Sequence, residues 1–462
     1  MEFLFSVFFL LFYYLRPQDW ISALTGVELI KPILAIWILV LLMGRSRESP
    51  LKGLLKTPHD WVIAAYFAYV VFTAPDFMEA FKGFLPLVLY YVLTVQSLST
   101  WERVSSYLRW WIVALCVIAV FGVLIRLGLD ITGGKENVAR FVDRLCLGTW
   151  LHNNPNALAH SVIVVLPAAF LLFFWRGTIG GRWLWFPLCA GLSIWCVYET
   201  VSKGAFLVGG ILVASVFVIG RPKVVQILTV VVALTVGGSV LSMLPRMSQM
   251  SDLRADEGVQ GRLMAWEIAR GVSRTNDTGV GWKQFLARID WKEESGMVYG
   301  IPKATHSSYV QVGADLGKYG MVLYLAGFWC AFHTLLRLRS DVDQEERCRR
   351  VLFVLLLGTV ASGWMINRQY HAEYFLLIAL AGAMHRLRKG EELGLESVPD
   401  DSTPNNELGE TARTEVPVPA VVVDESIESK PLWNRFGLVD ALVCASLAWA
   451  AFWAWDYVLN NL

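Results

Sequence analysis

The chain has 462 residues, of which 55% are hydrophobic and only 17% are charged, and its formal net charge at pH 7 is +1. A soluble globular protein carries about a quarter charged residues, so this composition excludes a soluble globule. We expect membrane lipids, and no nucleic acid, among the partners of this protein.

Hydrophobic runs long enough to cross a bilayer recur from one end of the chain to the other. A spanning helix needs about 20 mostly apolar residues, because about 30 Å of hydrocarbon must be crossed at about 1.5 Å per residue. The predicted spans are 2–15, 27–43, 60–74, 83–97, 108–125, 157–175, 183–198, 204–219, 224–243, 307–336, 351–366, 374–387 and 438–458. The predicted fold class is therefore all-α, a polytopic integral membrane helical bundle with about 12–13 transmembrane helices.

The short loops between these spans alternate in charge. Basic residues of short loops are retained in the cytoplasm. The basic residues are Arg45, Arg47, Lys52 and Lys56 after the second span, Arg103 and Arg109 after the fourth, Arg176 and Arg182 after the sixth, Arg221 and Lys223 after the eighth, Arg337, Arg339, Arg347, Arg349 and Arg350 after the tenth, and His385, Arg386, Arg388 and Lys389 after the twelfth. Because the alternation is unbroken, it predicts a cytoplasmic N-terminus and two long outer loops, 126–156 and 244–306.

Four regions follow from these patterns. They are N-terminal transmembrane helices at 1–128, a transmembrane core at 129–389 with the long outer loop 244–306, an acidic linker at 390–430, and a C-terminal hydrophobic helix at 431–462. Residues 391–429 hold eleven acidic residues and one basic residue, a composition that cannot bury a core and that predicts a disordered cytoplasmic linker. The last run is predicted to be a peripheral thirteenth span. The seven cysteines form no CxxC pair, so we expect no disulfide framework.

Polar residues on the predicted outer side are the candidates for chemistry. Lys203 lies between two apolar runs of the sequence. At such a position a buried cation costs free energy unless its side chain reaches the membrane surface or faces a polar cavity. Arg262, Trp266 and Arg270 are four residues apart and share one helix face, which also suits a helix lying on the lipid headgroups. Neither pattern alone separates function from membrane anchoring.

His306 stands where a polar loop becomes the tenth span. Imidazole titrates near pH ~6.5 and can accept a proton from a hydroxyl, although a histidine at a helix start is also a common cap. Asn156 ends the first long outer loop, where it could cap the sixth span. Arg368 belongs to an outer turn that could simply be solvated. On the predicted outer side no acidic pair repeats at a metal-ligand spacing, and the sequence contains no Walker-type or HExxH pattern, so we expect no metal and no cofactor.

Four short elements follow one another between residues 146 and 375, all on the predicted outer side. In chain order they are Gly148-Thr149 with Asn156-Ala157-Leu158-Ala159, then Thr200-Val201-Ser202-Lys203-Gly204, then Gly261-Arg262 with Trp266 and Gly279-Val280-Gly281, and finally His306-Ser307-Ser308-Tyr309 with Asp315-Leu316-Gly317-Lys318-Tyr319-Gly320. Together they resemble the elements of the O-antigen ligase and O-antigen polymerase superfamily of bacterial envelope enzymes. The departure is Lys203, where the family usually has arginine; lysine keeps the charge but loses the planar two-pronged contact to phosphate.

The resemblance implies a metal-independent glycosyltransferase of the bacterial inner membrane whose active site faces the periplasm. Its donor would be a glycan on undecaprenyl diphosphate, and its acceptor a hydroxyl of a glycan, of lipid A-core or of a protein. The implied roles are His306 as base, Lys203, Arg262, Arg270 and Arg368 as cations for the diphosphate, and Asn156, Tyr309 and Trp266 as contacts to glycan or acceptor.

Other readings stay open on the sequence. A polymerase that joins lipid-linked repeat units needs the same donor and a similar base, so these residues do not separate it from a ligase. Outside the enzyme class, a transporter of lipid-linked glycans or a membrane scaffold is the alternative. A transporter favours a polar site near the midplane of the bilayer, whereas the polar residues here gather on one predicted side.

Overall fold

The computed structural model describes residues 1–44, 54–218, 222–232, 235, 257–292, 298–392, 433 and 435–461. Most of the predicted linker 390–430, much of the predicted span 224–243 and part of the loop 244–306 lie outside these residues. In the described part, the regular structure other than helices is one antiparallel hairpin of β1 (Ala287–Lys292) and β2 (Val298–Lys303), in which Ala287 pairs with Lys303.

The helices follow the predicted hydrophobic runs closely. They are α1 (Glu2–Leu15), α2 (Pro17–Trp20), η1 (Ser22–Leu24), α3 (Ile30–Gly44), α4 (Pro58–Thr73), α5 (Phe77–Ser97), α6 (Trp101–Arg126), α7 (Lys135–Arg140), α8 (Pro155–Val162), α9 (Val165–Ala169), η2 (Phe170–Phe174), η3 (Gly181–Trp185), α10 (Phe186–Thr200), α11 (Lys203–Val218), α12 (Lys223–Val232), α14 (Glu257–Thr275), α15 (Ser308–Arg337), α16 (Asp343–Ser362), α17 (Ala372–Glu392) and α18 (Leu438–Asn461).

Several stretches of the described chain are long and apolar enough to cross a membrane. They are Phe77–Ser97, Trp101–Arg126, Pro155–Phe174, Ser308–Arg337 and Leu438–Asn461, and shorter apolar helices accompany them. The chain is thus a polytopic helical membrane protein, which confirms the predicted fold class.

The sixth predicted span, 157–175, is not one regular helix. It consists of α8, α9 and the π-helical turn η2. Pro167 has no N–H to donate to the carbonyl of Ile163, and its ring crowds that carbonyl. The break between α8 and α9 lies at this point in the chain, so the local sequence accounts for it.

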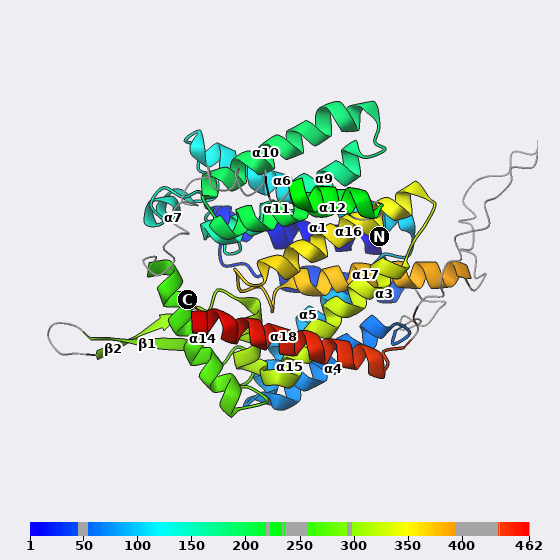
Figure 1. Ribbon diagram of the computed structural model, residues 1–462. Coiled ribbons are helices and arrows are strands. Elements are labelled where there is room, and N and C mark those ends of the chain that lie inside the picture. Colours follow the sequence, from blue (N-terminus) through cyan, green and yellow to red (C-terminus); the bar gives the residue numbers. More distant parts are fainter. Residues whose placement is uncertain are drawn as a thin grey trace, which may run out of the picture.

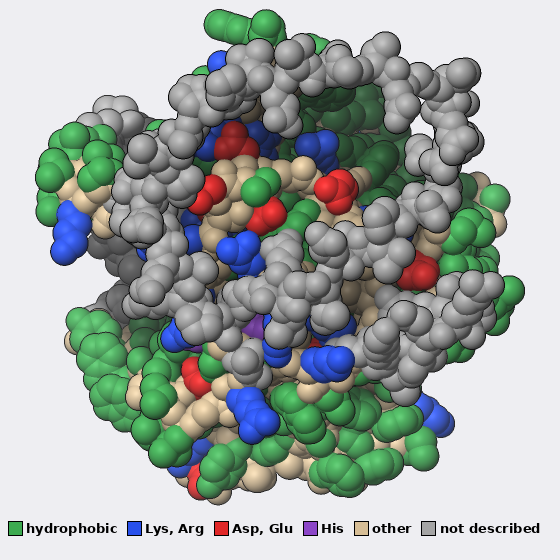
Figure 2. Space-filling model, turned by 90° about the vertical axis from the view of Figure 1, so that its right-hand side faces the viewer, with side chains coloured by type: hydrophobic (Ala, Val, Ile, Leu, Met, Phe, Trp, Pro, Cys, Tyr) green, Lys and Arg blue, Asp and Glu red, His purple; other side chains and the backbone are tan. Residues whose placement is uncertain are grey.

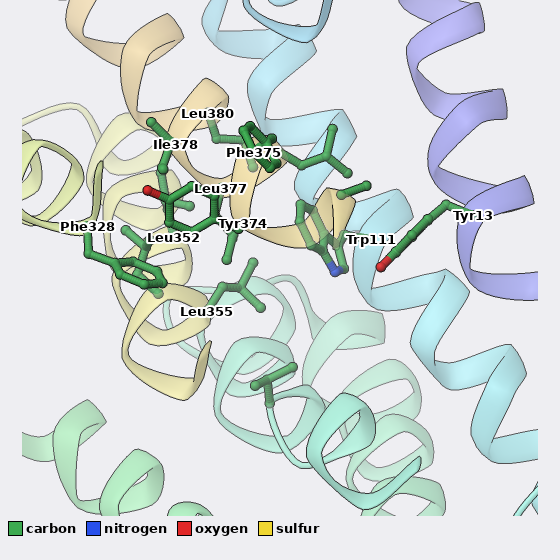
Figure 3. Packing of buried hydrophobic residues seen from close by; sticks show 14 of the residues in the cluster. Tyr13, Trp111, Phe328, Leu352, Leu355, Tyr374, Phe375, Leu377, Ile378 and Leu380 are labelled. Atoms are coloured by element: carbon green, nitrogen blue, oxygen red, sulfur yellow. The ribbon is translucent and has the colours of Figure 1, made fainter. Parts of the chain in front are cut away.

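Aromatic side chains from four helices form the centre of the core. Figure 3 shows Phe328 of α15 and Tyr374 of α17 facing one another, with Trp111 of α6 and Tyr13 of α1 further along. The Phe328 and Tyr374 rings are 5.1 Å apart, edge to face, and the Tyr374 hydroxyl donates to the carbonyl of Tyr324 at 2.7 Å. The buried hydroxyl is therefore satisfied inside the apolar core.

The two ends of the molecule differ. Figure 1 shows α7, α14, the β-hairpin and the C-terminus at one end, whereas the N-terminus and the end of α17 lie toward the other. Figure 2 faces that second end, where many Lys and Arg side chains are visible. Arg176, Arg339, Arg350 and Arg388, all from the basic loops, line an open cavity there. We call the end with α14 and the hairpin the hairpin end.

Candidate functional site

His306 lies at the hairpin end, between β2 and α15. Its backbone is left-handed, with φ of 50°, a conformation that is uncommon for a residue other than glycine and that recurs at functional sites. The next residues fix the turn: Ser307 caps α15 by accepting from the N–H of Val310, and the N–H of Ser308 donates to the carbonyl of Gly363 at 2.6 Å. The imidazole is thus presented by a rigid helix entry.

The surroundings of His306 disfavour its protonation. Burial, followed by the positive charges of Arg262 and Lys303, lowers its pKa from the ordinary 6.5 to about 4. Within the described part of the chain, no group donates to or accepts from its ring. At neutral pH the side chain is therefore an uncharged imidazole that can accept a proton.

Lys303 joins the site through a close approach to α14. A Cβ on Gly261 would come within 2.7 Å of Lys303 Cε, so the lysine side chain crosses the helix at the residue before Arg262. Sequence reasoning did not single out Lys303. Lys303 stands three residues before His306 in the sequence, but that spacing alone does not indicate a site. Only the folded hairpin brings the Lys303 side chain to α14.

Trp266 ties α14 to the loop that carries His306. Its indole Nε1 donates to the carbonyl of Thr305 at 2.7 Å, and its side chain is buried. Tyr309 is buried as well, with its hydroxyl donating to the carbonyl of Val360 at 2.7 Å. These contacts give both aromatics a structural role, and their contact with glycan or acceptor stays a prediction.

Asn156 contacts Ser202, the residue before Lys203. The Asn156 carbonyl oxygen Oδ1 accepts from Ser202 Oγ at 2.9 Å and from Arg144 Nη2 at 2.9 Å. The cap of α8 is Asn154, whose side chain accepts from the N–H of Asn156, so Asn156 is not the cap. Arg144 is a further cation that sequence reasoning missed, because only the folded chain brings it to Asn156.

His160 connects the two groups of residues. Its Nδ1 is 2.8 Å from Ser362 Oγ, and a Cβ on Gly204, the residue after Lys203, would lie 3.2 Å from its Nε2. The structure therefore brings Asn156, Lys203, Arg262 and His306 to one region of the hairpin end.

The glycine element 279–281 is held by Asp315. Gly281 N–H donates to the backbone carbonyl of Asp315 at 2.7 Å, and the Asp315 carboxylate accepts from the Phe285 N–H at 2.8 Å and from the Tyr370 hydroxyl at 3.0 Å. A Cβ on Gly279 would come within 2.4 Å of the Asp315 backbone. Residues 279–285 are thus held against α15 by hydrogen bonds to Asp315, and the Asp315 side chain is buried.

Two predicted diphosphate ligands have carboxylate partners inside the protein. Arg270 donates from Nε and Nη2 to the two oxygens of Asp456, each at 2.6 Å. Arg368 is buried, donates to both oxygens of Glu373 at 2.8 and 2.9 Å, and also donates to Ser161. Their role toward a diphosphate stays a prediction, and the contacts seen here are structural.

Among the described residues, no group of three or more His, Cys, Asp or Glu side chains is placed to hold a metal ion.

Residues 188–325 match the family model of the O-antigen ligases. Over this segment the chain is similar to the O-antigen ligases. The matched segment contains Lys203, Arg262 and His306, whereas Asn156 and Arg368 lie outside it. A comparison with curated proteins finds no match.

Proposed function

We propose that this protein, which is similar to the O-antigen ligases over residues 188–325, is a glycosyltransferase of the bacterial inner membrane. It moves a glycan from undecaprenyl diphosphate to an acceptor hydroxyl on the periplasmic side. The observation that carries the proposal is the neutral imidazole of His306 beside the cations Arg262 and Lys303. This pairing offers a base for the acceptor and positive charge for the leaving group.

The leaving group is a lipid diphosphate that gains negative charge as the glycosidic bond breaks. Fixed cations in a partly buried site stabilise that charge without reorganising during the reaction. We assign this role to Lys203 and Arg262 and add Lys303, which lies against the start of α14. Lys203 supplies a point charge rather than the two-pronged contact of arginine.

His306 is proposed to take the proton of the acceptor hydroxyl. The acceptor oxygen then forms a bond to the anomeric carbon, the bond from that carbon to the diphosphate oxygen breaks, and undecaprenyl diphosphate leaves with the electron pair. A base whose pKa is about 4 in the free protein is weak. The negative charge of the bound donor offsets the positive charges of Arg262 and Lys303 and thereby raises the pKa of His306. Donor binding therefore makes the imidazole a stronger base.

The test uses purified protein with a defined lipid-linked donor and acceptor. His306→Ala is expected to lower transfer by about 10²- to 10⁴-fold, the usual contribution of a general base. His333→Gln is the matched control, because this histidine lies near the far end of α15, the helix that begins just after His306. Wild-type transfer by His306→Ala at equal protein amounts would overturn the assignment.

The polymerase alternative uses the same residues and is separated by its product. In cells that lack the gene, loss of a ligase leaves long lipid-linked polymer, whereas loss of a polymerase leaves single lipid-linked repeat units. Chain-length analysis of the lipid-linked glycans distinguishes the two.

A further inference from the structure

The last helix, α18, ends beside α14. Asp456, near the end of α18, accepts from Nε and Nη2 of Arg270, each at 2.6 Å, and from Nη2 of Arg274 at 2.9 Å. The Arg270 guanidinium also lies over the Phe452 and Trp455 rings, with 5.1 and 5.5 Å to the ring centroids. This two-pronged ion pair with aromatic stacking fixes the direction of the arginine as well as its position.

The same end of α18 packs closely on α15. A Cβ on Gly313 would lie 3.0 Å from the Trp455 ring and 3.2 Å from the Phe452 ring. Gly313 lies seven residues, about two helical turns, after His306. Phe452 and Trp455 thus fill the space between α14 and α15, and a larger residue at 313 would push α18 away.

These contacts connect α18 to both proposed functional residues. Arg270 lies two turns after Arg262 on α14, and Trp266 between them donates to the carbonyl of Thr305, the residue before His306. One end of α18 therefore contacts the helix that carries Arg262 and the helix that begins after His306. Figure 1 shows the C-terminus, at the end of α18, next to α14.

The other end of α18 is fixed to the opposite end of α15. Asp440 accepts from the indole Nε1 of Trp329 at 3.0 Å, from the indole Nε1 of Trp433 at 3.0 Å and from the N–H of Gly437 at 2.9 Å. The helix is thus attached at both ends, and only the Asp456 end adjoins the proposed site. This asymmetry supplies a matched control within one helix.

We propose that α18, through Asp456, sets the position of Arg262 relative to His306, so that Asp456 and Arg270 are positioning residues of glycan transfer. Both residues act on the reaction through the position of α14, and this effect requires no contact of either residue with substrate. The inference rests on the proposed function, and it adds an element outside the matched segment 188–325 to the machinery of the site. A displacement of about 1 Å in such a site can cost on the order of 100-fold in rate.

The test compares Asp456→Asn, Asp456→Glu and Asp440→Asn in the full-length protein with defined donor and acceptor. Asp456→Asn is expected to lower kcat by about 10- to 100-fold with a smaller change in KM, and Asp456→Glu to recover part of the loss. In Asp456→Asn, Arg262 is expected to move away from His306, which raises the pKa of the imidazole. The acid limb of the pH profile of kcat should therefore move to higher pH. Asp440→Asn keeps wild-type kcat and an unshifted profile.

A second measurement does not depend on activity. Nitroxide labels on Met264→Cys in α14 and Tyr319→Cys in α15 report the spacing of the two helices, since both positions are exposed while six of the seven native cysteines are buried. Asp456→Asn should broaden the distance distribution, and Asp440→Asn should leave it narrow. Arg270→Lys, which keeps the charge but not the two-pronged contact, replaces Asp456→Asn if that variant does not reach the membrane.

Wild-type kcat and an unshifted pH profile in Asp456→Asn would overturn the inference, as would an equal loss in Asp440→Asn with an unchanged profile. If the wild-type protein transfers no glycan at all, the proposed function fails instead. The label distances then still decide whether Asp456 sets the spacing of α14 and α15.

Discussion

At the scale of single residues, the charge of the bound donor is expected to alter His306. The imidazole must be neutral to accept a proton, so activity rises with pH through its pKa. In the free protein, burial of the imidazole and the positive charges of Arg262 and Lys303 lower its pKa to about 4. A bound diphosphate is expected to raise this pKa. The acid limb of kcat, which reports the donor complex, should therefore lie at higher pH than the acid limb of kcat/KM.

The measurement is a pair of pH–rate profiles between about pH 3 and pH 8, taken at saturating and at limiting donor. Coincident acid limbs would show that donor binding leaves the imidazole unchanged. His306→Gln cannot titrate, so the acid limb should disappear from its residual activity, which serves as the control for other groups.

The order and charge of the sequence singled out Lys203, Arg262 and His306 as candidates, and their role in a site stays a prediction. Lys203 begins α11, Arg262 lies in the second turn of α14, and His306 precedes α15. Arg270 and Arg368 stay predicted diphosphate ligands, and the sequence did not show that each has a carboxylate partner within the protein. Asp456 lies 186 residues from Arg270, and no pattern in the sequence connects the two.

At the scale of elements, the kink of α15 depends on Gly317. Its φ of 66° and ψ of −159° lie in a region that only glycine occupies readily, and a Cβ there would come within 2.0 Å of the Asp277 carbonyl oxygen. Gly317→Ala should strongly lower the melting temperature of the purified protein, whereas Gly210→Ala, with open space around it in α11, should not. Equal melting temperatures would contradict a strained kink.

The ion pair of Arg368 and Glu373 connects α8, α17 and α1. Both side chains are more than nine-tenths buried, and Tyr14 of α1 donates to Glu373 at 2.8 Å. Removing one partner leaves a buried charge, which typically costs about 3–5 kcal/mol. Glu373→Gln and Arg368→Gln should therefore lower the free energy of unfolding by similar amounts.

Donor binding separates this structural role from the predicted one. If Arg368 also held the diphosphate, Arg368→Gln would weaken binding of the lipid-linked donor far more than Glu373→Gln does. Equal donor affinities in the two variants, measured at a temperature where both are folded, would restrict Arg368 to the ion pair.

The positions of helices were predictable because long apolar runs must cross the membrane as helices that satisfy their own backbone. The interruptions within the runs were not predicted. The break near Pro167 and the kink at Gly317 follow from a missing donor and from a backbone conformation, neither of which hydropathy measures. The predicted span 307–336 was thus correct in extent but not in shape.

At the scale of the whole molecule, the function requires that the hairpin end face the periplasm. The alternating basic loops predict this, and Leu286 near the hairpin and Ile179 between η2 and η3 test it, with 54% and 81% of their surfaces exposed. In intact spheroplasts a membrane-impermeant maleimide should label Leu286→Cys, whereas Ile179→Cys should react only after permeabilisation. The unsubstituted protein is the control for its own cysteines. The reverse pattern would place His306 in the cytoplasm and contradict transfer to a periplasmic acceptor.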